Sequence, residues 1–177
     1  IDPTVSFLHT FKAADMDDDG DLDLITAEMH QSSDPDEVSI YVNDGGGLIW
    51  NQVVVDTSGS HNIRIGDIGS DGDLDLYGAN WSESAPNSAV IEVGENQSGP
   101  LPLNLWRRHI VETNLPWNAV FVEGTDLNGD QLPDLVTGGW WYPNPGGLAG
   151  AWNRTVIGSP LENLAVSHDF DGDGDID

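Results

Sequence analysis

Aspartates at alternate positions form four short acidic segments. They occupy residues 15–23, 67–75, 126–134 and 169–177, called loops 1 to 4 below. Oxygen-bearing side chains stand at positions 1, 3, 5 and 9 of each loop, except that Gly69 occupies position 3 of loop 2. Alternate carboxylates on a backbone that glycine allows to curl can surround one hard cation, whereas without a cation they would repel one another. The spacing therefore predicts up to four Ca²⁺ ions, one per loop.

The loops recur as part of a longer repeat. Their first aspartates are 52, 59 and 43 residues apart, and Trp50, Trp106 and Trp152 each precede the next loop by 17 to 20 residues. His9 and His61 each lie six residues before their loop. Such periods are typical of stacked structural units. We therefore treat residues 1–177 as one segment with units at about 1–60, 61–116 and 117–162, and an incomplete unit at 163–177.

Within a unit, β-prone runs alternate with turn sequences, and no helical periodicity persists. The predicted strands are residues 5–14, 22–27, 38–42 and 49–55, then 61–65, 74–79, 89–93 and 105–111, then 119–123, 135–137, 141–142 and 151–157. Four strands per unit predict an all-β fold made of β-propeller blades. Closed propellers commonly need four to eight blades, so we expect an incomplete propeller or a fragment.

The composition limits the possible partners. Of 177 residues, 31 are acidic and 5 basic, for a formal net charge of −26, and 18 of the acids lie in the four loops. The 38% apolar content with seven Trp indicates a folded protein. The negative field disfavours nucleic acid and anionic membranes as partners. Cysteine is absent, and no apolar run has the length of a membrane span.

The loops resemble the FG-GAP or VCBS repeats, which are calcium-loop β-propeller repeats of integrin α-subunits and secreted bacterial proteins. The resemblance covers nearly the whole chain, including Trp-Tyr-Pro-Asn-Pro-Gly-Gly at residues 141–147. It implies that each loop joins the first two strands of a blade and binds calcium. The implied side-chain ligands are Asp15, Asp17, Asp19, Asp23, Asp67, Asp71, Asp75, Asp126, Asn128, Asp130, Asp134, Asp169, Asp171, Asp173 and Asp177.

The resemblance also implies one backbone carbonyl ligand per loop, at position 7. These residues are Asp21, Asp73, Leu132 and Asp175. Gly69 departs from the pattern and removes one oxygen, so loop 2 should bind calcium most weakly or rely on water.

Other readings of the loops can be compared with the residues. EF-hands need a Glu at position 12 between two helices, and dockerin-like loops need an acid there, but these loops have Thr26, Gly78 and Thr137. Magnesium prefers fewer protein ligands and more water. Solvated acidic turns without a metal remain the alternative.

The sequence favours a binding module over an enzyme. It contains no nucleophile elbow, phosphate loop or zinc signature, and no catalytic residue is assigned. Trp81, Trp117, Trp140 and Trp141 are candidates for stacking on neutral sugars. The once-per-unit tryptophans at 50, 106 and 152 are expected to pack between sheets.

We therefore expect a calcium-binding β-propeller module, extracellular or at the cell surface, with a structural, adhesive or ligand-binding role towards a glycan or protein. Weak calcium sites are filled outside the cell, where calcium is near millimolar. Sequons at Asn80, Asn96 and Asn153 agree with this setting, although such motifs often arise by chance. Two alternatives stay open: the propeller domain of an extracellular carbohydrate-active enzyme, and a filament subunit that self-associates through open blade edges.

Overall fold

The computed structural model describes residues 5–29, 32, 35–80, 90–99, 103–113, 115, 121–158 and 166–177. Within these residues the chain forms twelve β-strands and no helix, and therefore no helix that could span a membrane. The strands build three four-stranded sheets, in which each strand pairs with the next in antiparallel register. The all-β expectation is confirmed.

Each sheet contains four consecutive strands. Sheet 1 consists of β1 (Leu8–Ala14), β2 (Asp23–Glu28), β3 (Val38–Asn43) and β4 (Trp50–Asp56). Sheet 2 consists of β5 (Asn62–Gly66), β6 (Asp75–Asn80), β7 (Val90–Asn96) and β8 (Trp106–Glu112). Sheet 3 consists of β9 (Glu123–Thr125), β10 (Asp134–Thr137), β11 (Trp140–Tyr142) and β12 (Thr155–Val156).

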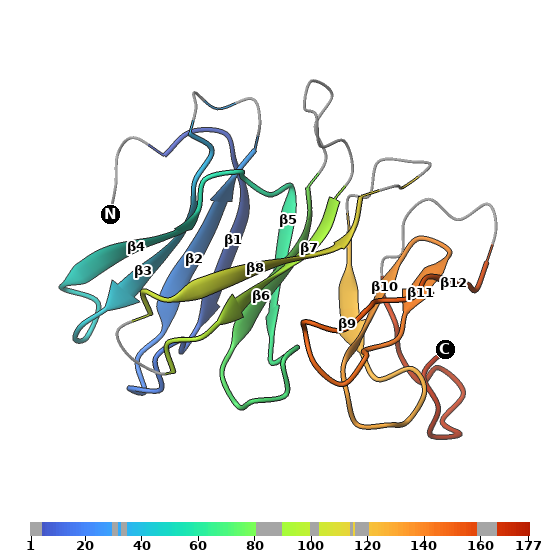
Figure 1. The fold of residues 1–177 in the computed structure, drawn as a ribbon. Helices are drawn as coiled ribbons and strands as arrows, with labels where there is room; N and C mark the ends of the chain where they lie inside the picture. Colours follow the sequence, from blue (N-terminus) through green and yellow to red (C-terminus); the bar gives the residue numbers. More distant parts are fainter. Residues whose placement is uncertain are drawn as a thin grey trace.

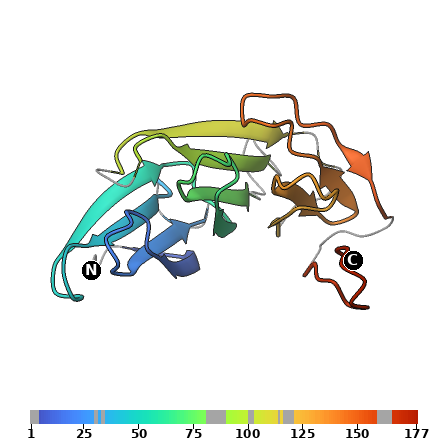
Figure 2. The same cartoon turned by 90° about the horizontal axis from the view of Figure 1, so that it is seen from below.

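The three sheets stand side by side along a curved row (Figures 1 and 2). Figure 2 shows the first strand of each sheet on the concave side and the outer strands on the convex side. Neighbouring first strands touch, since β1 contacts β5 and β5 contacts β9. The described residues thus form an open arc of blade-like sheets and not a closed propeller.

Apolar side chains fill the spaces between the sheets. One cluster joins sheet 1 to sheet 2 and includes Ile25, Ile40 and Leu76. The other joins sheet 2 to sheet 3 and includes Tyr77 and Tyr142. Leu76 and Tyr77 are adjacent on β6 and enter different clusters, because successive strand residues point to opposite faces. Sheet 2 is therefore covered on both faces.

The predicted strands agree with the observed ones except in the third unit. There the strand predicted at 151–157 is observed only at Thr155–Val156. The strand predicted at 119–123 is observed at Glu123–Thr125, and residues 119–120 lie outside the described residues. Trp106 and Trp152 pack against the two inter-sheet clusters as expected. Trp50 is only partly buried and joins neither cluster formed by the described residues.

One ion pair links each pair of neighbouring outer strands. Asp56 at the end of β4 lies 3.9 Å from Arg108 of β8. Glu112 at the end of β8 lies 3.4 Å from Arg154, which precedes β12. Both arginines stand two residues after a repeat Trp, so the repeat brings an acid of one sheet to a base of the next. The guanidinium of Arg154 also lies 4.1 Å from the centroid of the Trp140 ring.

We expect Arg154→Ala to lower the free energy of unfolding by about 1–2 kcal/mol, because it removes a partly exposed ion pair and a cation–π contact. Arg107→Ala is the matched control, since Arg107 is exposed on β8. Urea denaturation measures both. Equal losses in the two variants would contradict a specific role for Arg154.

Candidate metal centres

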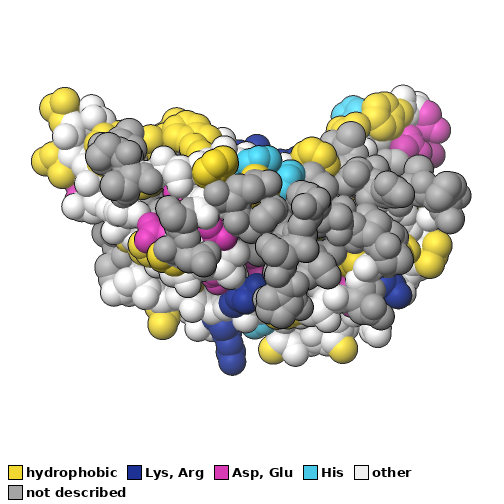
Figure 3. All heavy atoms as spheres, turned by 90° about the horizontal axis from the view of Figure 1, so that it is seen from above, with side chains coloured by type: hydrophobic (Ala, Val, Ile, Leu, Met, Phe, Trp, Pro, Cys, Tyr) yellow, Lys and Arg dark blue, Asp and Glu magenta, His cyan; other side chains and the backbone are white. Residues whose placement is uncertain are grey.

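The loops lie along one edge of the arc. Loops 1, 2 and 3 join the first and second strands of sheets 1, 2 and 3, and loop 4 follows at the end of the chain. Figure 1 shows all four at the lower edge. Figure 3 shows the opposite edge, where several groups of acidic side chains are visible among the residues drawn in colour. The fold nevertheless concentrates the loop carboxylates on one side.

The position 1 carboxylate shapes each loop. In loop 1, Asp15 Oδ1 accepts a hydrogen bond from the Asp19 amide at 3.1 Å, and Oδ2 accepts one from the Gly20 amide at 2.9 Å. Asp67, Asp126 and Asp169 accept equivalent bonds in their loops. The curl places Gly20 at a φ of 94°, which glycine adopts without a Cβ penalty.

In loop 1 the curl brings three carboxylates together. One oxygen each of Asp15, Asp17 and Asp19 lies within 4.8 Å of the others. Asp17 is buried, and no described group donates a hydrogen bond to its Oδ1. Burial, followed by the charges of Asp23 and Asp19, raises the pKa of Asp17. A buried carboxylate oxygen without a partner is costly, so this site suits a cation.

The other loops vary this arrangement. In loop 4, Asp169, Asp171 and Asp173 also have oxygens within 4.8 Å, but their side chains are more exposed. In loop 3, Asn128 takes position 3, and its amide group donates to Asp130 Oδ2 at 3.0 Å. In loop 2, Gly69 supplies no side chain at this position.

The position 9 aspartate connects each of loops 1 to 3 to its sheet. Asp23, Asp75 and Asp134 are all 0% exposed. Asp75 Oδ2 accepts from the Gly69 amide and its Oδ1 from the Asn96 amide at the end of β7, both at 2.9 Å. The aspartates at 23 and 134 make the same two-sided contact, with an amide of their loop and the amides of residues 43 and 144.

Burial has an electrostatic consequence at Asp75. Desolvation raises its pKa from 3.8 to about 6, although the amides of Asn96 and Gly69 act in the opposite direction. The folded chain therefore holds this proton more tightly than the unfolded chain. Hence the contribution of Asp75 to stability falls as the pH rises between these two values. At neutral pH the ionised loop opposes folding unless a bound cation compensates it.

Two features that frame the loops were not predicted from the sequence. The first is the apolar residue at position 2, since Met16 and Ile68 are buried in the inter-sheet clusters. The second is the Asn after the third strand. Asn144, for example, donates from Nδ2 to the Ile68 carbonyl at 3.0 Å and thereby ties sheet 3 to loop 2. Both features have a signal in the sequence. Every loop has an apolar residue at position 2, and an Asn-x-x-Gly turn begins at residues 43, 96 and 144.

The remaining candidates are placed less favourably for binding. Trp140 is buried, Trp141 is half-buried and donates from Nε1 to Asp134 Oδ2 at 2.8 Å, and residues 81 and 117 lie outside the described residues. Asn96 is buried, which disfavours glycosylation there, whereas Asn153 is exposed. The side chain at residue 80 is not described. The rings of His9 in β1 and His61, which directly precedes β5, lie 4.5 Å apart as a structural pair.

Comparison with known families agrees with this geometry. Residues 15–78 match the family model of the FG-GAP-like repeat. This segment is an FG-GAP-like repeat. It begins at the first aspartate of loop 1 and ends within β6, just beyond loop 2. No curated protein and no solved structure matches the chain significantly. The assignment of individual loop residues as calcium ligands stays a prediction.

Proposed function

We propose that this FG-GAP repeat chain is a calcium-stabilised β-propeller-type module that works outside the cell or on its surface in an adhesive or ligand-binding role. The buried Asp17 oxygen beside Asp15 and Asp19 carries the calcium part of the proposal. Carboxylate oxygens are the ligands that calcium prefers. The family match and the all-β sheets support the module itself.

Calcium would supply positive charge at the point where each sheet begins. The side chains at positions 1, 3, 5 and 9 would hold it, together with the position 7 carbonyl. The position 9 aspartates already fix the loop to the third strand, so metal binding and sheet formation are coupled through one residue. Loops with these ligand types outside the cell need only weak affinity to be filled.

The test uses loop 2, in which Gly69 at position 3 has no side-chain oxygen. A Cβ added at Gly69 would lie 3.5 Å from Oδ2 of both Asp71 and Asp75, which is ordinary contact. We expect Gly69→Asp to strengthen calcium binding at loop 2 by roughly tenfold, because it restores an anionic ligand. Isothermal titration with calcium measures the change.

Gly69→Ala is the matched control, since it adds the same Cβ without an oxygen. It should leave the affinity at or below that of the natural chain. In the calcium-free protein, Gly69→Asp should instead lower stability, because it adds a carboxylate to an acidic cluster. Equal calcium affinities of the Asp and Ala variants, or no calcium binding by the natural chain, would refute the calcium proposal.

A further inference from the structure

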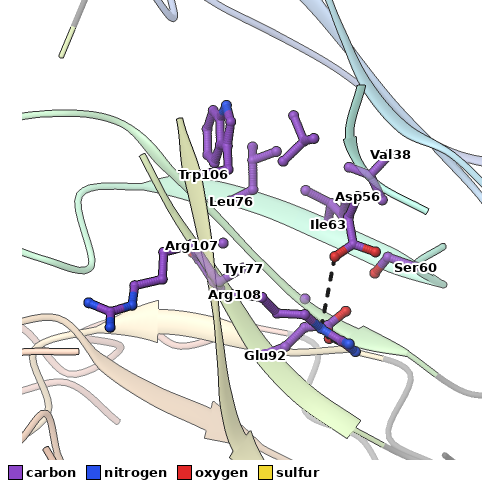
Figure 4. Close-up of a pocket in the computed structure, with 13 residues that line it drawn as sticks. Val38, Asp56, Ser60, Ile63, Leu76, Tyr77, Glu92, Trp106, Arg107 and Arg108 are labelled. Atoms are coloured by element: carbon purple, nitrogen blue, oxygen red, sulfur yellow. Dashed lines mark hydrogen bonds and ion pairs between the residues drawn. The ribbon is translucent and has the colours of Figure 1, made fainter. Parts of the chain in front are cut away.

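A cavity lies between sheets 1 and 2 (Figure 4). Its volume is about 190 Å³, and residues of β3 to β8 line it. One end is apolar, with Leu76 and Trp106. The other end is polar and gathers Asp56, Ser60, Glu92 and Arg108, all of which line the cavity.

The polar end contains both hydrogen-bond donors and acceptors. Arg108 donates from Nε to Glu92 Oε2 at 2.6 Å, while its Nε lies 3.9 Å from Asp56 Oδ2, too far for a hydrogen bond. Asp56 Oδ1 accepts from the Ser58 amide at 2.6 Å. Ser60 is 2% exposed, and no described group forms a hydrogen bond with its hydroxyl. A buried hydroxyl without a partner at the wall of a cavity is a position for a ligand group.

The polar end is also reachable. The side chains of Arg108 and Asp56 remain 35% and 29% exposed. Glu92 is more enclosed, and desolvation raises its pKa while Arg108 acts in the opposite direction. The cavity can therefore be reached from its polar end.

Size and chemistry together restrict the ligand. A volume of this size holds about six water molecules, which is less than the roughly 300–1,000 Å³ of drug-sized sites. A guanidinium, two carboxylates and a hydroxyl suit a molecule with several hydroxyl groups, which both donate and accept. The negative field of the chain disfavours an anion. Apolar walls beside these groups suit the C–H face of a sugar ring.

We propose that this inter-sheet cavity binds a small neutral polyol, of the size of one sugar ring, through Asp56, Ser60, Glu92 and Arg108. The site gives the chain a ligand class and a binding position that the calcium loops do not supply. None of its residues belongs to a loop, so it does not depend on the calcium proposal.

The experiment titrates calcium-saturated protein with glucose, galactose, mannose and inositol. Isotope-labelled protein is followed by NMR, and the affinity is fitted from shift changes of the amides of β7 and β8. Glucosamine and glucuronate are titrated in parallel as cationic and anionic probes of similar size. We expect the neutral probes to shift signals of the cavity residues and the glucuronate to have no effect.

Three variants locate the site. Ser60→Ala should raise the dissociation constant by roughly tenfold, the effect of one lost hydrogen bond in a buried site. Gly94→Val should abolish binding, because the added side chain fills the cavity. The fold should tolerate it, since a Cβ at residue 94 would make only ordinary contacts of 3.6 Å with the Leu76 carbonyl oxygen and 3.8 Å with Trp106. Arg107→Gln is the control: Arg107 also lines the cavity, but its side chain points away from the polar end (Figure 4).

A thermal melt of each variant with calcium verifies folding. Loss of binding in the first two variants with retention in the third supports the proposal. No shift with any neutral probe, tighter binding of glucosamine, or binding that survives Gly94→Val in a folded protein would each overturn it. The result for polyol binding is independent of the result for calcium binding, because the thermal melts test calcium binding separately.

Discussion

Chelating calcium should lower the melting temperature of this protein by about 5–10 °C for each occupied loop. If calcium binds the folded loops but not the unfolded chain, as proposed, each site adds about 2.7 kcal/mol at a hundredfold excess over the dissociation constant. For a chain of this length, 1 kcal/mol corresponds to about 2–4 °C. Calorimetry with and without a chelator measures the shift.

Magnesium provides the control for this experiment. It prefers octahedral sites that keep several waters, so an equal concentration should restore much less stability than calcium does. The size of the calcium effect should also follow the ligand sets. Asp15→Asn and Asp17→Asn in loop 1 should reduce it more than Asp18→Asn, because residue 18 lies outside the ligand positions. A melting temperature that is unchanged by the chelator would exclude structural calcium.

Asp75→Ala should destabilise even the calcium-free protein, by about 2–4 kcal/mol. The substitution leaves the amides of Gly69 and Asn96 without their acceptor. Relief of the desolvation that raises the pKa of Asp75 offsets part of this loss. The position 9 residue is thus expected to have a structural role in addition to metal binding.

Asp73→Ala, two residues away, is the matched control. Desolvation and the nearby charge of Asp71 raise the pKa of Asp73, so its removal relieves repulsion. We expect a change near zero without calcium. Urea unfolding in chelator separates the two roles. If Asp75→Ala and Asp73→Ala cost the same without calcium, the bridge from loop to third strand does not stabilise the fold.

The repeat itself was evident from the residues, because local chemistry sets it. Alternating aspartates with glycine favour a curled loop, and β-prone runs between turn sequences favour strands. The predicted strands in the first two units therefore match the observed ones to within a few residues. The third unit is compact, and there the strand predicted at 151–157 was too long because only Thr155–Val156 pairs with β11.

The individual roles of chemically identical residues required the fold. The ligand pattern separates Asp23 at position 9 from Asp21 at position 7, but it does not predict that burial and two amides make Asp23 a bridge from loop 1 to Asn43. Sugar stacking was predicted for Trp140, but Arg154 and the inter-sheet core occupy that ring. Such differences depend on which sheet lies opposite, and sequence spacing does not encode this.

The sequence by itself determined four candidate calcium loops, a repeating four-stranded unit, and an FG-GAP-like repeat at residues 15–78. Each follows from interactions between residues close in the chain. Only the tertiary structure decided that the loops share one edge, that loop and third strand meet at a buried aspartate, and that sheets 1 and 2 enclose a polar cavity. These features join residues that are tens of positions apart, and the packing of one sheet on the next brings them together.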